Sequence, residues 1–400
     1  MKEKIIKDTI FIYDKDLIKP TQTRSLYLKE QVKRLLEIPQ PEQRSQEWYE
    51  LRDSMLTASD WATILGTSPY SNKNSLLLKK CGKNIPFPSN SAIDWGVKYE
   101  DVAVQIYESR NNNKVLLFGC LRHPTINYLG ASPDGITEDG IMLEIKCPSS
   151  REITGEPPVY YWTQVQAQLE VCELDRCDFL ECKLLEYDNK YDYENDHYNN
   201  DYSINSNGME KGCVLELYNK ETKTFIFQYS PLGITGIELE NWINNILNKF
   251  NEENNIFIIS TISYWYLVKI SCVPIYRNQE WFNSNLNLLK DFWDEILYWR
   301  KNGIEKLEEK INLEKKPSKR KQNNNKEFID LGILDFDDNH SSSNNFDSLF
   351  SNNLFSSKTF NKEIKNNDSN YNIDTETESD SDSSNLMIDS SLYINCFSKK

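Results

Sequence analysis

Three charged residues, Asp134, Glu144 and Lys146, lie in short segments that otherwise have the composition of buried strands. Side chains of a strand alternate between two faces, so in GIMLEIKCP, residues 140–148, Glu144 and Lys146 share one face. Alone, Glu-x-Lys is most often a surface ion pair and Pro-Asp-Gly a turn. The short connection from Asp134 to Glu144 nevertheless allows a hairpin-like unit that brings the carboxylates together. Two carboxylates beside an ammonium group would suit a hard cation and hydrolytic chemistry.

A third carboxylate, Glu100, lies in a segment with the periodicity of a helix. In residues 92–108 the apolar stripe runs through Ile93, Val97 and Tyr107, and it includes Glu100. A carboxylate on an apolar face costs free energy unless it is paired, coordinated or protonated. Two interpretations stay open, because Glu100 either reaches solvent or a helix cap, or is a third ligand of the same cation.

The charge of the chain is unevenly distributed. The 400 residues carry a formal net charge of -15, which by itself disfavours a nucleic-acid partner. Residues 326–400 hold 14 Asp and Glu against six Lys, so they contribute -8 and the other residues only -7. The excess of negative charge is therefore concentrated in the tail.

The pattern of apolar residues and cysteines predicts a soluble protein of a reducing compartment. No segment approaches the roughly 18 to 20 consecutive apolar residues of a membrane span, and the start has no apolar signal segment. Nine scattered cysteines, an odd number, favour free thiols over a disulfide framework. We expect the cytoplasm or a viral replication compartment and no membrane partner. The basic run Lys315–Lys321 is interpreted as a solvated linker, with a nuclear-import or nucleic-acid-binding patch as the weaker alternative.

Helix and strand patterns mix between residues 41 and 235, which predicts an α/β (α+β) core. Inside this core, residues 186–212 are polar and aperiodic. We interpret them as a long loop inserted in a hairpin between the strands 177–187 and 213–219.

Three further segments flank the predicted core. Residues 1–40 form an N-terminal arm whose segment 22–37 has the spacing of an amphipathic helix. Residues 236–312 are helical and aromatic in pattern and predict a helical accessory segment. Residues 313–400 are rich in Asn, Ser, Asp and Glu and predict a disordered linker and acidic tail.

Four segments in order resemble the lambda-type alkaline exonucleases, or YqaJ-like viral recombinases, of the PD-(D/E)xK nuclease superfamily. They are WYELRDSMLTASD (48–60), WGVKYEDVA (95–103), GASPDGI with LEIKCP (130–148) and YYWTQVQAQLEV (160–171). The resemblance covers about residues 44–179. It implies a restriction-endonuclease-like fold with a central mixed sheet flanked by helices.

The resemblance also implies roles for individual residues. The catalytic set is Glu100, Asp134, Glu144, Lys146 and Gln164. Mg²⁺, with Mn²⁺ able to substitute, would be held by Glu100, Asp134, Glu144 and the backbone carbonyl of Ile145. Arg52 and Ser59 match residues that bind a 5'-phosphate, for which a guanidinium group and a hydroxyl are chemically suited.

The function implied is a Mg²⁺-dependent 5'-to-3' exonuclease on double-stranded DNA that makes single strands for recombination. A single-strand annealing protein and a homo-oligomeric ring are implied as partners. A structure-specific endonuclease and a non-catalytic DNA-binding scaffold are alternatives. An iron–sulfur nuclease is weakly indicated, because Cys172, Cys177 and Cys182 are spaced C-x4-C-x4-C rather than in the tighter runs of cluster ligands.

Overall fold

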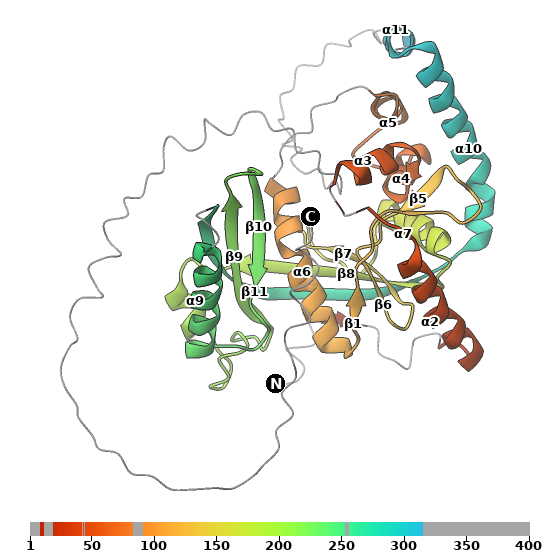
Figure 1. Cartoon of the computed structure of the whole chain (residues 1–400). Coiled ribbons are helices and arrows are strands. Elements are labelled where there is room, and N and C mark those ends of the chain that lie inside the picture. Colours follow the sequence, from red (N-terminus) through yellow and green to blue (C-terminus); the bar gives the residue numbers. More distant parts are fainter. Residues whose placement is uncertain are drawn as a thin grey trace, which may run out of the picture. The chain divides into compact units, whose positions relative to one another are not determined.

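The fold is described from a computed structural model, for residues 9–11, 19–41, 43, 45–82, 91–252 and 256–314 (Figure 1). All of these residues fall within the compact unit Met1–Ser342. The basic run Lys315–Lys321 and the acidic tail lie outside the described residues.

Runs of helices and runs of strands are interspersed along the chain. The strands are β1 (Thr9–Phe11), β2 (Leu56–Thr57), β3 (Val115–Leu116), β4 (Leu121–Arg122), β5 (Leu129–Ala131), β6 (Gly135–Thr137), β7 (Met142–Lys146), β8 (Arg176–Glu186), β9 (Lys211–Asn219), β10 (Thr224–Tyr229) and β11 (Phe257–Tyr276). The helices are α2 (Gln22–Glu37), α3 (Gln46–Asp53), α4 (Ala58–Ile64), α5 (Lys73–Lys80), α6 (Ser91–Asn111), α7 (Val159–Cys172), α8 (Lys190–Asn195), α9 (Gly236–Glu252), α10 (Gln279–Asn302) and α11 (Ile304–Glu314).

The larger sheet is mixed. Its strand order is β10-β9-β11-β8-β7-β6-β3, and β1 pairs with β11 in parallel. β7 and β8 are parallel, whereas the other neighbours in this order are antiparallel. Strands β2, β5 and β4 form a smaller sheet. The predicted α/β class with a central mixed sheet is confirmed.

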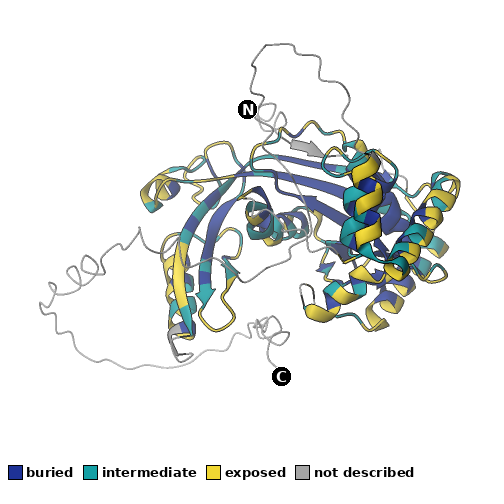
Figure 2. Ribbon diagram, turned by 90° about the horizontal axis from the view of Figure 1, so that it is seen from above, coloured by how far each residue is buried: buried dark blue, intermediate teal, exposed yellow. Residues whose placement is uncertain are grey.

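Helices α6 and α7 cover opposite faces of the larger sheet. Met142 of β7 belongs to the hydrophobic cluster that includes α7, whereas Leu143 and Ile145 belong to the cluster that includes α6. Figure 2 shows that the buried residues run along the strands of this sheet and that the helices expose their outer faces. By alternation, Glu144 and Lys146 point to the same side as Met142, towards α7.

The hairpin predicted around Asp134 and Glu144 is confirmed as β6 and β7, in which Ile136 pairs with Met142. Gly140 turns the chain with a φ of 81°, a left-handed conformation that glycine adopts without strain. A Cβ on Gly140 would also stand 2.8 Å from the Cβ of Leu28. This turn therefore packs closely on α2, the predicted helix 22–37.

The predicted helical segment 236–312 is wrong for Phe257–Tyr276, which form the long strand β11. Its register shifts at two places, between Ile259 and Thr261 and between Leu267 and Lys269. Each irregularity interrupts the alternation of side chains, so the strand pattern is hidden. Helices α9, α10 and α11 occupy the rest of that segment, as predicted.

The predicted hairpin between 177–187 and 213–219 is also wrong. β11 lies between β8 and β9 and pairs with both, so the two strands are not neighbours. The segment 186–212 is not an irregular loop throughout, because it contains α8. Pairing with a strand that lies much later in the sequence cannot be recognised from the local pattern of β8 and β9.

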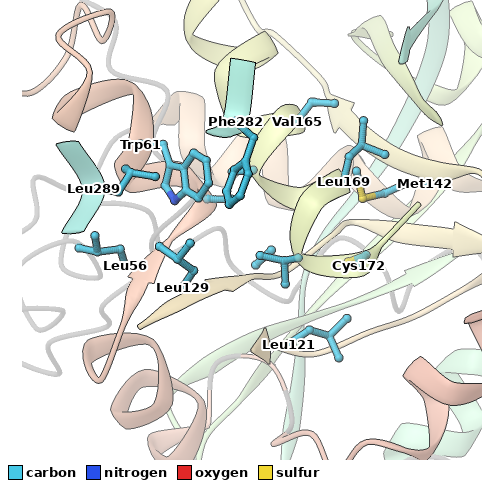
Figure 3. Packing of buried hydrophobic residues seen from close by; sticks show 14 of the residues in the cluster. Leu56, Trp61, Leu121, Leu129, Met142, Val165, Leu169, Cys172, Phe282 and Leu289 are labelled. Carbon is cyan, nitrogen blue, oxygen red and sulfur yellow. The ribbon is translucent and has the colours of Figure 1, made fainter. Parts of the chain in front are cut away.

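A large aromatic and aliphatic cluster joins α4, α7 and α10 (Figure 3). The rings of Trp61 and Phe282 are stacked with centroids 5.6 Å apart. Leu56 and Leu289 are fully buried in the same cluster. Aromatic pairs of this kind add to the apolar burial that fixes helix against helix. The cluster therefore holds α4, which carries Ser59, against helix α10.

Candidate active site

A cavity of about 110 Å³ gathers most of the residues predicted for catalysis. Part of its lining comes from α3, the start of α4 and α6, and the rest comes from β7 with the residues after it, α7 and the residues before β6. The predicted residues that line it are Arg52, Ser59, Glu100, Asp134, Ile145, Lys146 and Gln164. Glu144 is 0% exposed and does not itself line the cavity. It contacts two residues that do, Lys146 and Gln164.

Asp134 is positioned by the backbone of the neighbouring strand. Its Oδ2 accepts a hydrogen bond from the backbone N–H of Ile145, with a distance of 2.6 Å. Asp134 directly precedes β6, and Ile145 lies in β7, which pairs with β6. The hairpin therefore brings the aspartate carboxylate to the strand that carries Glu144 and Lys146.

Glu144 accepts hydrogen bonds from three side chains. Its Oε1 lies 2.8 Å from Lys146 Nζ and 2.7 Å from Gln164 Nε2, and its Oε2 lies 2.6 Å from Gln168 Nε2. A buried carboxylate needs such donors, because it has lost its contact with water. Sequence reasoning missed Gln168, although it is four residues after Gln164 and therefore on the same face of α7.

Glu100 lies at the edge of the buried face of α6. It is half-buried and lines the cavity, whereas Tyr99, Ala103 and Ile106 form the fully buried part of that helix. The apolar stripe predicted for this helix was therefore wrong by about one residue at its centre, where Tyr99 rather than Glu100 is fully buried. This position gives the carboxylate of Glu100 access to the cavity that Asp134 also lines.

The thiol of Cys147 lies close to charged groups of this cavity. Burial raises the pKa of Cys147 well above its ordinary value, and nearby groups that include Glu100 and Asp134 raise it further, whereas Lys146 acts in the opposite direction. A carboxylate disfavours a second negative charge close by. Two carboxylates, Glu100 and Asp134, thus lie close to Cys147, and both also line the cavity.

Arg52 lines the cavity from near the end of α3. Its guanidinium carbon is 4.3 Å from the centre of the Trp48 ring, and its Nη1 donates to Ser132 Oγ at 3.2 Å. Ser59 lies in the first turn of α4, and its hydroxyl is 3.1 Å from that of Thr57. Trp48 and Ser132 also line the cavity and were missed by sequence reasoning.

The comparison with family models identifies the part of the chain that holds this cavity. Residues 47–175 match the YqaJ-like viral recombinase domain. This segment is therefore similar to a YqaJ-like viral recombinase domain. It contains every residue predicted for the site, so the resemblance seen in the four motifs is confirmed.

Two viral proteins are similar over different shares of the chain. Uncharacterized protein R354 of Acanthamoeba polyphaga mimivirus is 34% identical over 331 residues, which are 75% of this chain and 60% of that protein. A protein of African swine fever virus, strain Badajoz 1971 Vero-adapted, is 28% identical over 163 residues, which are 32% of this chain and 46% of the viral protein. The chain thus spans about half to three fifths of these relatives.

Among solved structures, the chain is similar to LHK-Exo, an alkaline exonuclease from Laribacter hongkongensis. The complex of LHK-Exo with dAMP gives a TM-score of 0.39 and 19% identity, covering 67% of this chain and 99% of that one. Because the TM-score is low, the fold assignment rests on the sheet order and the site geometry given above.

The donor atoms of the YqaJ-like domain fit a hard divalent cation in kind. Carboxylates and backbone carbonyls are the ligands that Mg²⁺ prefers, and Glu100, Asp134 and Ile145 line the same cavity. Among the described residues, however, no three His, Cys, Asp or Glu side chains already converge as a metal site. In this structure the carboxylate of Glu144 faces Lys146 and glutamines.

The cysteines of the YqaJ-like domain and β8 do not form a cluster site. Cys172 and Cys177 pack in the hydrophobic cluster on the α7 face of the sheet, whereas Cys182 packs on the α6 face. Three thiols divided between two faces cannot bind one iron–sulfur cluster, so this alternative is contradicted.

Helices of the described residues are too short or too polar to cross a bilayer.

Proposed function

We propose that the chain is a metal-dependent deoxyribonuclease that hydrolyses phosphodiester bonds in double-stranded DNA from the 5' end. The observation that supports it most is the convergence of Asp134, Lys146 and Gln164 on the cavity that Arg52 and Ser59 also line. A phosphate bound between Arg52 and Ser59 would place the terminal nucleotide near the catalytic side chains. Such a subsite favours an exonuclease over an endonuclease.

Each catalytic side chain has a separate task in this proposal. Mg²⁺, when bound by Glu100, Asp134, Glu144 and the carbonyl of Ile145, would offset negative charge that develops on the phosphate. Lys146 positions the attacking water and helps its deprotonation. Gln164 holds Oε1 of Glu144 and so orients that carboxylate. Glu100, Asp134 and the carbonyl of Ile145 would hold the cation beside the strand that carries Lys146.

The proposal extends to the setting of the reaction. The eight described cysteines are free, and viral proteins are among the relatives, so we propose a reducing compartment such as the cytoplasm or a viral replication compartment. A single-strand annealing partner and a homo-oligomeric ring rest on the family resemblance alone. Measuring the mass of the particle in solution tests the ring directly.

Digestion of three DNA substrates tests the proposed activity. Linear duplex with 5'-phosphate ends should be degraded faster than the same duplex with 5'-hydroxyl ends, and closed circular duplex should stay intact. The reaction should require added Mg²⁺ or Mn²⁺ and should stop in EDTA. Cleavage of the closed circle would identify an endonuclease. An Asp134→Asn variant is the matched negative control for a contaminating nuclease.

A further inference from the structure

Lys80, at the end of α5, is a buried cation that the proposed catalytic set does not include. Its side chain is 4% exposed. The ammonium nitrogen donates to the carbonyl oxygens of Arg52, at 3.2 Å, and Met55, at 3.0 Å, and lies 2.9 Å from Oδ2 of Asp60. A lysine ammonium has three N–H donors, so these three acceptors match it. One side chain thereby ties the end of α3 to the first turn of α4.

Asp60 connects this cation to the residues around Ser59. The Asp60 side chain is 6% exposed, and its Oδ2 accepts from the backbone N–H of Thr57 at 2.8 Å and from Thr57 Oγ1 at 2.9 Å. The same Thr57 hydroxyl lies 3.1 Å from Ser59 Oγ. Lys80 is therefore linked to the main chain of Arg52 on one side and to the hydroxyl of Ser59 on the other.

Arg300, near the end of α10, forms hydrogen bonds to the ends of α5 and α3. Its Nε donates to the carbonyl oxygen of Lys80 at 2.8 Å, and its Nη2 donates to the carbonyl oxygen of Asp53 at 2.6 Å. One guanidinium group thus holds the ends of α5 and α3 together. Helix α10 therefore contacts the ends of α5 and α3, close to Arg52.

We propose that Lys80 and Asp60 are positioning residues that set the separation between the guanidinium of Arg52 and the hydroxyl of Ser59. Replacement of a buried ion pair by apolar side chains often leaves stability unchanged, so stability alone does not call for these charges. An apolar side chain could not hold two carbonyls and one carboxylate at once. The inference rests on the proposed function of Arg52 and Ser59 and adds residues that determine selectivity for a terminal 5'-phosphate.

The test is a double variant, Lys80→Met with Asp60→Asn, which removes both charges and leaves no lone buried ion. Metal-free protein in EDTA is titrated with short duplexes that carry 5'-phosphate or 5'-hydroxyl ends, and the ratio of the two affinities is compared. We expect this ratio to fall about tenfold, since a misplacement of about 1 Å can cost a hundredfold. Thermal unfolding should show that the variant is folded.

Arg277→Met combined with Glu170→Gln provides the matched control, because it also removes both charges of a largely buried ion pair. Arg277 forms an ion pair with Glu170 at 2.6 Å, with side chains 14% and 10% exposed, and neither residue lines the cavity. Its affinity ratio should equal that of the wild type. If the double variant does not fold, Arg300→Gln leaves the ion pair in place, and a smaller fall in the same ratio is expected.

The outcomes separate this inference from the nuclease activity. A folded double variant with an unchanged ratio overturns the positioning role, and so does an unchanged ratio in Arg300→Gln when only that variant folds. A wild-type protein that does not distinguish the two ends overturns both the 5'-phosphate subsite and the inference. A wild type that distinguishes the ends but cleaves neither, with the ratio lost in the variant, supports the inference and overturns the nuclease.

Discussion

The two walls of the cavity place their functional groups by different means. On the sheet wall, Asp134, Glu144 and Lys146 are held by the β6–β7 hairpin and by hydrogen bonds to β7 and α7. On the helical wall, Arg52 and Ser59 lie on two short helices that side chains from other elements hold together. Backbone register fixes the first wall, and tertiary contacts fix the second.

This difference separates two kinds of expected defect. In the proposed function, the groups of the sheet wall act on the scissile phosphate, so damage there should lower the rate of the chemical step. In the same proposal the groups of the helical wall bind the terminal phosphate, so damage there should change the choice of DNA end. Four predictions test this division, beginning with the largest expected effect.

Lys146→Ala tests the sheet wall most severely. Loss of the ammonium that lies 2.8 Å from Glu144 should lower the cleavage rate about 10²- to 10⁴-fold, the usual contribution of a positioned acid–base group. Binding of metal-free protein to duplex DNA should change little. Single-turnover cleavage is the measurement, with the exposed Lys290→Ala as control. Near wild-type cleavage by folded Lys146→Ala protein would remove this lysine from the mechanism.

Gln168→Leu tests whether the orientation of Glu144 matters. The variant loses the hydrogen bond to Oε2, and a hydrogen bond to a charged group is worth about 1.5–3 kcal/mol, so we expect kcat to fall about tenfold to a hundredfold. KM should change less. Gln166→Leu is the matched control, because Gln166 is equally buried on α7 but donates to the carbonyl of Tyr276. Equal losses in the two variants would indicate a general effect on α7.

The sheet wall was the part of the site that the sequence predicted best. Asp134, Glu144 and Lys146 lie within 13 consecutive residues, so local alternation and one short turn are enough to bring them together. Gln168 was accessible to the same reasoning, through its i+4 relation to Gln164. The helical cores of α2 and α6 were predicted for the same reason, since their apolar spacing is local.

The sequence could not predict the contacts that span the chain. Lys80 is 28 residues from Arg52, and Arg300 is 220 residues from Lys80, so no spacing rule relates them. β11 was assigned to a helical segment because its register shifts hide the strand pattern. Its insertion between β8 and β9 depends on pairing along its whole length, which the local sequences of those two strands do not encode.

Arg52→Ala tests the helical wall. We expect the ratio of rates on 5'-phosphate and 5'-hydroxyl ends to fall about tenfold, the scale of one charge-assisted hydrogen bond, while the rate on hydroxyl ends changes less. Arg52→Lys should not restore the ratio, because an ammonium cannot both stack on Trp48 and present a planar fork to phosphate. An unchanged ratio in Arg52→Ala would assign the end preference to another residue.

The smallest effect concerns His123, whose ring stacks on Phe282 of α10 with centroids 6.1 Å apart. Burial lowers the pKa of His123, against the opposing influence of Glu170 and Glu173, and its Nδ1 accepts from the backbone N–H groups of Thr125 and Ile126. Both observations favour the neutral ring in the folded protein.

The sign of the pH dependence follows from that lowered pKa. In the unfolded chain this histidine takes up a proton below about pH 6.5, whereas in the folded protein it stays neutral to a lower pH. The contribution of His123 to the unfolding free energy is therefore complete above about pH 6.5 and is lost as the pH falls through the folded pKa. His123→Asn keeps an acceptor near Nδ1 and does not titrate. Urea unfolding at pH 7.5 and 5.5 should therefore show a smaller loss of unfolding free energy for His123→Asn than for the wild type. Equal losses would mean that protonation of His123, which stacks on Phe282, does not contribute to the pH dependence of the unfolding free energy.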